Sequence, residues 1–241
     1  MTDRLNIAMW SGPRNLSTAL MRSFGNRADV TSVLDEPLYA AYLTVTGKNH
    51  PMRDEVIASQ SSDSDIVAMN CTQSIGKGIC YQKHMVHHLH HTFNDQWIFK
   101  LNNCFLIRNP KEVISSFLAK WPDAQFNDFG FNEQLNIFNL VSNGAEEMPL
   151  VIDATDLRNN PKDVLKKVCL RLSIPWDQGM LGWNAGLKSY DGVWASHWYR
   201  SVESSTCFIK SNKKTKHVSE RTKLIIEMAM PSYYALYKHK I

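Results

Sequence analysis

The sequence lacks several features that would place it in well-known protein classes. Its five cysteines are scattered, odd in number and form no CxxC pair, which argues against a disulfide framework and a cysteine-based zinc site. No stretch reaches the ~18 apolar residues of a membrane span, and Asn6 and residues 11–15 interrupt the apolar stretch that a signal peptide would need. We therefore expect a cytoplasmic protein with reduced thiols and no membrane partner.

A large excess of charge of one sign is also missing. The 27 basic residues only slightly outnumber the 23 acidic residues, and this small excess suits an anionic small ligand better than a nucleic acid. No internal repeat or low-complexity linker divides the 241 residues. Because a chain of this size buries a full core without disulfides, we expect a single domain over residues 1–241.

Short apolar stretches alternate with helical patterns along the chain. Such strand–helix pairs cover residues 5–26, 31–43, 79–91, 104–121 and 149–172. A strand followed by a helix, repeated in this way, is typical of a parallel sheet covered by helices on both faces. The pattern therefore predicts an α/β fold with a central sheet of about five parallel strands.

The first strand–helix pair carries a possible anion site. An apolar strand at residues 5–10 is stopped by Gly and Pro, and a helical pattern then begins with Arg14, Ser17 and Thr18 at its start. The unpaired N–H groups of a helix start bind anions readily. The Walker pattern GxxxxGK[ST] does not fit, because its lysine position falls on Thr18, so Arg14 must supply the positive charge. A plain turn capped by Ser or Thr is the alternative.

Charged side chains also follow two later strands. Asp35 and Glu36 come directly after the strand at 30–34, and Lys83 and His84 after the strand at 79–82. Open α/β sheets bind ligands at the carboxyl edge of their strands. The alternative for the two carboxylates is that they only complement the dipole of the next helix.

A fourth strand end offers a second anion site. Arg108 follows the strand at 104–107, and the helix at 111–121 places Ser116 two turns further on. We expect the two side chains to stand near one another and to form a phosphate clamp. A surface ion pair is the alternative for Arg108.

Five histidines fall between residues 84 and 91. On a helix, His84, His87 and His88 would share a face, a spacing that could suit a metal. No carboxylate or cysteine accompanies them at ligand spacing. We therefore favour a partly exposed helix of titrating histidines and expect no metal.

The C-terminal part combines aromatic residues with a group of lysines at 210, 213, 214 and 216. Aromatic and basic side chains together could stack a base and hold a phosphate, although a solvated loop is the favoured alternative. Residues 219–230 are predicted to form a capped helix that ends at Pro231, before a short terminal helix at 233–240.

Taken together, three of these segments resemble the P-loop sulfotransferases. They are Arg14 to Leu20, Lys83-His84-Met85, and RNPKEVISS at 108–116. The whole chain is similar to a little-characterised bacterial branch of that family through the segments SGPRNLST, DEPLYAAYL, KHMVHH, FLIRNP, DGVWASHWY and SVESSTCF. Some members of this branch have aminotransferase-like names, but no motif of a pyridoxal phosphate enzyme is present. The resemblance implies a three-layer P-loop-type fold over residues 1–241.

The resemblance also implies a reaction. A sulfuryl group would pass from 3′-phosphoadenosine 5′-phosphosulfate (PAPS) to a hydroxyl or amine of an unknown small-molecule or carbohydrate acceptor, without a metal. Arg14, Asn15, Ser17 and Thr18 match the residues that hold the 5′-phosphosulfate, with Arg14 at a position that is usually lysine. The family's glycine-rich C-terminal segment is not recognisable, and the lysines at 210–216 are candidates to replace it.

Further roles follow from the same resemblance. Arg108 and Ser116 have the spacing of the family's 3′-phosphate clamp. Lys83 is the candidate for stabilising the transferred sulfonate. Glu36 is the first candidate for the general base, because family members use a carboxylate after this strand. His84 is the second, since an unperturbed imidazole titrates near neutral pH.

Two other functions compete with this interpretation. The first is a kinase-like P-loop enzyme that uses Mg-ATP, against which the missing Walker lysine argues. The second is a non-catalytic module that keeps the fold and binds an anionic nucleotide without turnover. Magnesium-dependent binding of ATP would favour the first, and nucleotide binding without transfer to any acceptor would favour the second.

Overall fold

Five parallel strands form the centre of the molecule in the computed structural model, which describes residues 4–74, 76–210 and 219–241. The sheet order is β2-β3-β1-β4-β5. The strands are β1 (Leu5–Ser11), β2 (Val30–Asp35), β3 (Ile79–Met85), β4 (Asn102–Ile107) and β5 (Leu150–Asp153). The predicted α/β fold with a five-stranded parallel sheet is therefore confirmed.

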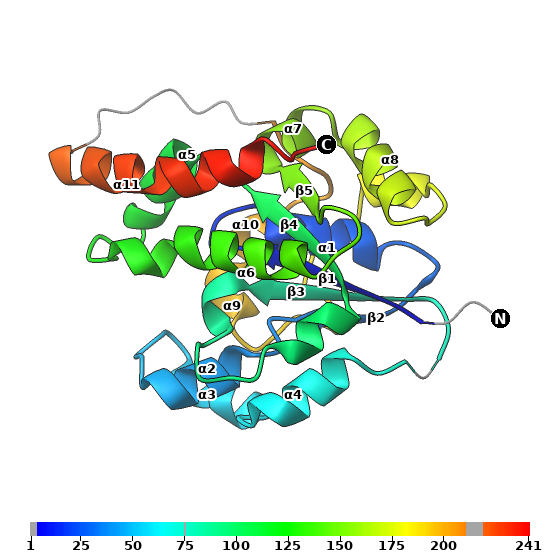
Figure 1. The fold of residues 1–241 in the computed structure, drawn as a ribbon, viewed down its shortest axis with the longest axis horizontal. Coiled ribbons are helices and arrows are strands. Elements are labelled where there is room, and N and C mark those ends of the chain that lie inside the picture. Colours follow the sequence, from blue (N-terminus) through cyan, green and yellow to red (C-terminus); the bar gives the residue numbers. More distant parts are fainter. Residues whose placement is uncertain (1–3, 75, 211–218) are drawn as a thin grey trace.

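Helices connect the strands and cover the sheet (Figure 1). The helices are α1 (Ser17–Gly25), α2 (Tyr39–Thr46), α3 (Arg53–Ser59), α4 (Ser64–Cys71), α5 (Pro110–Leu118), α6 (Phe131–Asn143), α7 (Ala154–Asn159), α8 (Pro161–Arg171), α9 (Ala195–Trp198), α10 (Arg200–Glu203) and α11 (Glu220–Tyr237). Short 3-10 helices span Val86–His88, Gln96–Lys100, Phe126–Phe129 and Gln178–Leu181. Among the described residues, no helix combines the length and apolar composition that a membrane span requires.

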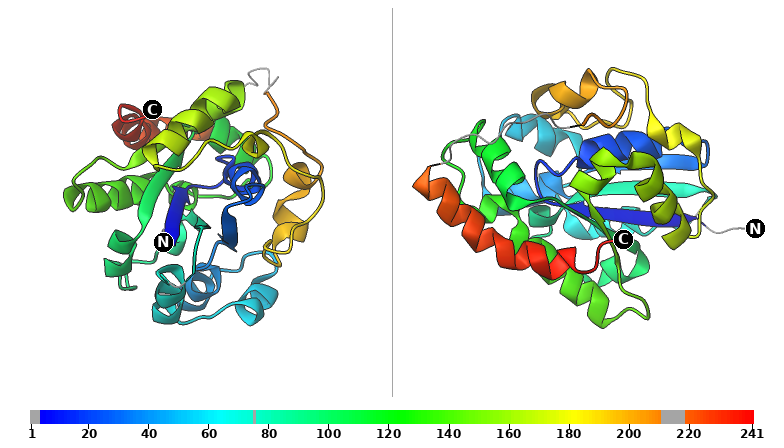
Figure 2. Two further views of the ribbon diagram at one scale, coloured as in Figure 1. Left: turned by 90° about the vertical axis from the view of Figure 1, so that its right-hand side faces the viewer. Right: turned by 90° about the horizontal axis from the view of Figure 1, so that it is seen from above.

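Side chains that alternate along the strands build a core on each face of the sheet. Ile7 and Met9 of β1 pack with residues of α1 and α8 on one face, whereas Ala8 and Trp10 pack with residues of α4, α6 and α11 on the other. Figure 2 shows α1 and α8 on the side of the sheet opposite to α6 and α11. This alternation gives the three layers that a two-faced parallel sheet requires.

The strand order brings distant parts of the sequence to one edge. β1 lies in the middle of the sheet, with β3 on one side and β4 on the other. Because all five strands are parallel, their carboxyl ends lie along the same edge, and the turn after β1 sits between the ends of β3 and β4.

Several predicted boundaries are wrong. β3 runs to Met85, so Lys83 and His84 lie within the strand and do not follow it. The predicted histidine helix is reduced to the single 3-10 turn Val86–His88. The lysines at 213, 214 and 216 lie outside the described residues, so their predicted role stays a prediction.

The C-terminal helix does not stop at Pro231. Instead α11 continues to Tyr237 with the proline inside it. A proline within a helix costs about 3 kcal/mol. Here the helix buries Ile225 and Ala229 before the proline and Tyr233 and Leu236 after it. Burying a large apolar side chain contributes about 1.5–3 kcal/mol, so packing on both sides of Pro231 outweighs the broken backbone hydrogen bond.

Candidate active site

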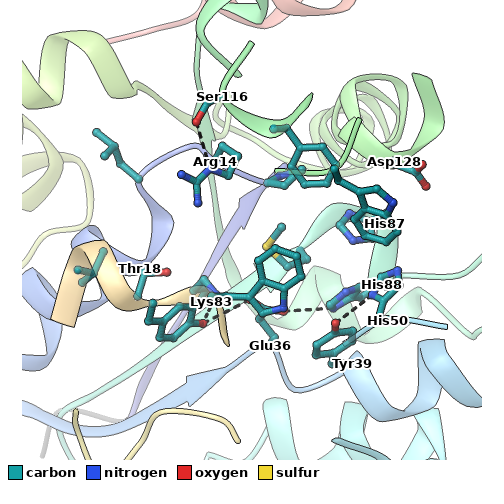
Figure 3. Close-up of a pocket in the computed structure, with 18 of the residues that line it drawn as sticks. Arg14, Thr18, Glu36, Tyr39, His50, Lys83, His87, His88, Ser116 and Asp128 are labelled. Atoms are coloured by element: carbon teal, nitrogen blue, oxygen red, sulfur yellow. Dashed lines mark hydrogen bonds and ion pairs between the residues drawn. The ribbon is translucent and has the colours of Figure 1, made fainter. Parts of the chain in front are cut away.

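A cavity of about 330 Å³ opens at the carboxyl edge of the sheet. Its wall receives side chains that lie at or after the ends of all five strands, and a close-up shows several of them pointing toward one another (Figure 3). Six of the residues predicted from sequence line it, namely Arg14, Thr18, Glu36, Lys83, Arg108 and Ser116.

The turn between β1 and α1 has an unusual backbone. A side chain at Gly12 would begin 2.6 Å from the carbonyl oxygen of Phe129, so the close approach requires glycine. Arg14 and Leu16 both have positive φ, of 64° and 67°, a conformation that costs about 1–3 kcal/mol for residues other than glycine. Leu16 is the N-cap of α1 and has no hydroxyl to cap it. The alternative of a plain turn capped by Ser17 or Thr18 is therefore wrong.

Arg14 joins the two predicted anion sites. Its Nε donates a hydrogen bond of 3.3 Å to Oγ of Ser116, and its carbonyl oxygen accepts a bond of 2.7 Å from Arg108. Burial, together with repulsion from the nearby Arg108, lowers the pKa of Arg14. The sequence predicts that Arg108 and Ser116 lie near one another. Arg14 links them, because it contacts both residues.

Arg108 is buried, with only 5% of its side chain exposed. It donates to Glu112 one turn further along α5, at 2.5 and 3.0 Å. Asn109 caps α5 with its side chain and Pro110 is the first residue of the helix, so Arg108 lies in the short link between β4 and α5. The alternative of an ion pair is thus partly right, but the pair lies in the cavity wall and not on the surface.

A third guanidinium, Arg158, also reaches the cavity. It belongs to α7, which follows β5, and lies 3.9 Å from Glu112. Its Nε is buried and has no hydrogen-bond partner within the described ranges. Burial and the neighbouring Arg108 lower its pKa, and Glu112 only partly offsets them. Arg108 and Arg158 share the single carboxylate of Glu112, and Arg14 lies beside Arg108, so the group keeps positive charge for an anionic ligand.

Lys83 forms the centre of a buried network. Its ammonium donates to Asp35 at 3.0 Å, to Glu36, and to the hydroxyl of Tyr199 at 2.7 Å. Burial disfavours the charged ammonium, but the two carboxylates outweigh it and raise the pKa of Lys83. Since an ammonium has three protons, every proton of Lys83 is already engaged.

Tyr199 closes this network from the C-terminal part of the chain. Its hydroxyl lies 2.8 Å from both carboxylate oxygens of Asp35 and accepts a bond of 3.1 Å from Trp194. A buried, bidentate ion pair between Arg22 of α1 and Asp191, at 2.5 and 2.6 Å, holds the part of the chain that leads to Tyr199 against α1. The backbone N–H of Gly192 also donates to Asp35, at 3.1 Å.

Glu36 lies in the cavity wall between Lys83 and His88. Its backbone has a φ of 46°, in the left-handed region, so the chain turns sharply after β2. One carboxylate oxygen is held by Lys83, and the other lies 3.8 Å from Nδ1 of His88. Burial raises the pKa of Glu36, and the attraction of Lys83 only partly opposes this.

The far end of the cavity is aromatic. Tyr39, Tyr42, His50, His87 and Trp121 line it. The hydroxyl of Tyr39 lies 2.9 Å from Nδ1 of His50. Burial lowers the pKa of His50 to about 4 and that of His87 to about 3, so these rings are neutral at pH 7. The expectation of a partly exposed helix of titrating histidines is wrong for this segment.

Three predicted site residues do not line the cavity. His84 points to the opposite face of the sheet from Lys83, where its ring stacks on Trp10 at 4.4 Å between centroids. Asn15 is buried and donates to the carbonyl oxygen of Leu106 at 3.0 Å, which fastens the turn to β4. Ser17 is buried at the start of α1. Among the described residues, all three are absent from the cavity wall.

The sequence interpretation missed His88, Arg158 and Tyr199. Arg158 could have been found, because α7 directly follows the end of β5 and therefore starts at the same edge as the other sites. His88 was grouped with a predicted helix, which hid its position. Tyr199 lies 164 residues from Asp35, and no local pattern indicates such a contact.

Comparison with known proteins gives a consistent result. Residues 5–240 match a protein family described as Sulfotransferase domain. Two Arabidopsis thaliana proteins, named branched-chain-amino-acid aminotransferase-like protein 1 and 2, are 36% and 34% identical over 235 residues, which is 97% of this chain. The matched region covers 42% and 41% of those proteins, so the chain spans about two fifths of their length.

Solved structures share the fold. A sulfotransferase from Alicyclobacillus acidocaldarius has a TM-score of 0.58, with 10% identity, and the alignment covers 100% of this chain and 98% of that one. The sulfotransferase domain from the curacin biosynthetic pathway has a TM-score of 0.54, with 14% identity, covering 94% and 98%. At these identities the likeness extends to the fold alone.

Proposed function

Because this chain belongs to the family of sulfotransferase domains, we propose that it transfers a sulfuryl group from PAPS to a hydroxyl or amine. The observation that carries this proposal is the convergence of Arg14, Arg108 and Arg158, from the ends of three different strands, on one cavity that also holds Glu36 and Lys83. The phosphate groups of a doubly phosphorylated adenosine donor carry the negative charge that would balance these three arginines.

The donor lies, in this proposal, along the turn after β1. Arg14, Thr18 and the unpaired N–H groups of α1 hold the 5′-phosphosulfate. Arg108, Ser116 and Arg158 hold the 3′-phosphate, where charge-assisted hydrogen bonds are worth about 1.5–3 kcal/mol each. Arg158 takes the place of the family's unrecognised C-terminal segment.

Catalysis rests on positioning and electrostatics, as in phosphoryl transfer. Arg14 stabilises the negative charge that develops on the bridging oxygen as the sulfur–oxygen bond breaks. Lys83 provides a fixed positive charge near the sulfonate and orients Glu36. Glu36 supplies the negative charge that balances the proton as the acceptor loses it.

The acceptor enters, in this proposal, through the aromatic end of the cavity. Tyr39, Tyr42 and Trp121 offer flat apolar surfaces there, and the ring of His50 contacts all three. The acceptor's hydroxyl or amine then approaches the sulfur from the side opposite to the leaving phosphate, as in-line attack requires.

Calorimetry with 3′,5′-adenosine bisphosphate and with Mg-ATP tests the donor class. We expect the bisphosphate to bind more tightly, and without magnesium, because both of its phosphates have arginine partners. Tighter binding of Mg-ATP that depends on magnesium would instead support a kinase-like enzyme. Bisphosphate binding without transfer to any of a broad panel of phenols, alcohols and amines would indicate a non-catalytic module.

A further inference from the structure

His88 is a buried histidine beside Glu36 to which the sequence interpretation assigns no catalytic role. Only 2% of His88 is exposed, yet the residue lines the cavity. Its Nδ1 is buried and finds no hydrogen-bond partner in the part of the chain that the structure describes. The same nitrogen lies 3.8 Å from Oε2 of Glu36, which is the oxygen that Lys83 does not hold.

The ring of His88 is fixed in this orientation. It stacks on Tyr39 with 4.4 Å between centroids and an interplanar angle of 13°, and on Tyr42 with 4.9 Å and 29°. Two tyrosine rings thus restrict its rotation, and His87 stands against it edge to face at 4.5 Å. The stacking fixes the plane of the ring, and in this plane Nδ1 lies on the side of Glu36.

We propose that His88 and Glu36 act as a pair, in which His88 takes the proton from the acceptor and Glu36 stabilises the charge that His88 gains. This proposal rests on the proposed sulfuryl transfer. With Nδ1–H directed at Glu36, the lone pair of the neutral ring is on Nε2, which is the nitrogen available to the acceptor.

The reaction balances without a further reagent. The O–H or N–H bond of the acceptor breaks, and its proton passes to Nε2 of His88. The acceptor's electron pair forms the new bond to sulfur. The bond between sulfur and the bridging oxygen breaks, and its electron pair leaves on 3′,5′-adenosine bisphosphate. The imidazolium then donates its Nδ1–H to the carboxylate of Glu36.

The surroundings favour a neutral His88 before reaction. Burial lowers the pKa of His88 well below its ordinary value, and the nearby His87, His50, Lys83 and His84 act in the same direction. The other titratable groups around the ring are Glu36, Tyr39 and Tyr42. A ring that is neutral at pH 7 is ready to accept a proton, and the short distance to Glu36 lets the carboxylate stabilise the product.

Nitrogen NMR of the ¹⁵N-histidine-labelled protein tests the pair without any acceptor. We expect His88, identified by the loss of its signals in His88→Phe, to be neutral with the proton on Nδ1 at pH 7. Its signals should move in Glu36→Gln and stay unchanged in Glu112→Gln, a matched change at the cationic end. A proton on Nε2, or signals that ignore Glu36→Gln, would overturn the pairing.

Kinetics test the catalytic role. With PAPS and the best substrate from a panel of simple phenols, alcohols and amines, His88→Phe should lower kcat by ~10²–10³. Because phenylalanine keeps a flat ring to stack on Tyr39 and Tyr42, the Kd of 3′,5′-adenosine bisphosphate should not change. His91→Gln, an exposed histidine, is the control. An unchanged kcat in His88→Phe would refute the catalytic role of His88. If the wild-type protein does not bind the bisphosphate at all, the proposed function is refuted instead.

Discussion

The guanidinium of Arg108 donates a hydrogen bond of 2.7 Å to the backbone carbonyl oxygen of Arg14. The two residues are 94 positions apart, and each follows a different strand of the sheet. The bond fixes the turn after β1 against the start of α5. The two anion sites that the sequence predicts separately, at Arg14 and at Arg108, therefore form one wall of the cavity. Replacing either arginine should alter the position of the other.

Replacing Arg108 tests the wall directly. Arg108→Ala removes a charged donor from the proposed 3′-phosphate site and releases the carbonyl oxygen of Arg14. We expect the Kd of 3′,5′-adenosine bisphosphate to rise roughly 10- to 150-fold, the equivalent of about 1.5–3 kcal/mol. Calorimetry measures this, with Arg53→Ala as a control in a surface ion pair. An unchanged Kd would exclude Arg108 from the site.

Arg158 should distinguish nucleotides by their second phosphate. Because we assign it to the 3′-phosphate, Arg158→Ala should weaken binding of 3′,5′-adenosine bisphosphate about tenfold or more and leave binding of adenosine 5′-monophosphate unchanged. Arg171→Ala, in an exposed pair with Glu147, is the matched control. Equal losses for both nucleotides would show that Arg158 acts on the general charge of the cavity and not on one phosphate.

Glu36 should matter for turnover and not for donor binding. Glu36→Gln keeps the size of the side chain but removes the negative charge that balances the proton taken from the acceptor. We expect a loss of ~10²–10⁴ in kcat, with a bisphosphate Kd close to that of the wild type. Glu133→Gln, a change in the first turn of α6, serves as the control. Rates like those of the wild type in Glu36→Gln would remove Glu36 from this role.

The hydroxyl of Tyr199 should stabilise the fold. Tyr199→Phe removes one buried hydrogen-bond partner from Lys83 and from Asp35, and it removes the acceptor of the Trp194 indole N–H. An unsatisfied buried polar group costs about 1–3 kcal/mol. Urea unfolding should show a loss of this size. Tyr234→Phe, at a side chain exposed on α11, should change stability little. Equal stability of the two variants would contradict the role given to the network.

Buried neutral histidines should make the protein sensitive to mild acid. Burial lowers the pKa of His84 to about 3, so near pH 6 the unfolded chain binds a proton that the folded chain does not. Stability is therefore complete above pH 6.5 and falls as the pH drops toward the folded pKa. For each fully buried histidine the loss is roughly 1 kcal/mol between pH 7 and pH 5.5.

Urea unfolding at several pH values measures this loss. His84→Gln should flatten the dependence by about the amount due to one histidine, because glutamine does not titrate. His91→Gln, which changes an exposed side chain, should leave the slope as it is. A slope that is identical in wild type and His84→Gln would show that His84 is not the group responsible.

The sequence was sufficient to predict the sheet and most of the cationic wall. The strands are rich in apolar residues and end beside a Gly, Pro or charged residue, so the ends of all strands except β3 are visible locally. Arg14, Glu36 and Arg108 follow directly from this logic. Arg158 escaped because α7 is a short, polar helix of six residues with no clear periodicity.

The remaining errors come from contacts that only the folded chain contains. Pairing with β1 extends β3 beyond its apolar part, because the backbone of β1 continues the ladder to Met85. This places His84 inside the strand and turns its side chain away from the cavity. The position of Tyr199 depends on the ion pair of Arg22 with Asp191, which joins α1 to a segment more than 160 residues later.

The alternation of Lys83 and His84 along β3 limits how this protein can evolve. If one residue were inserted or deleted earlier in β3, every later side chain of the strand would move to the opposite face of the sheet. The ammonium would then face the indole of Trp10, and the imidazole would enter the carboxylate network. Descendants of this chain should therefore tolerate length changes in the loop before β3 but lose both the core and the reaction when the change falls within the strand.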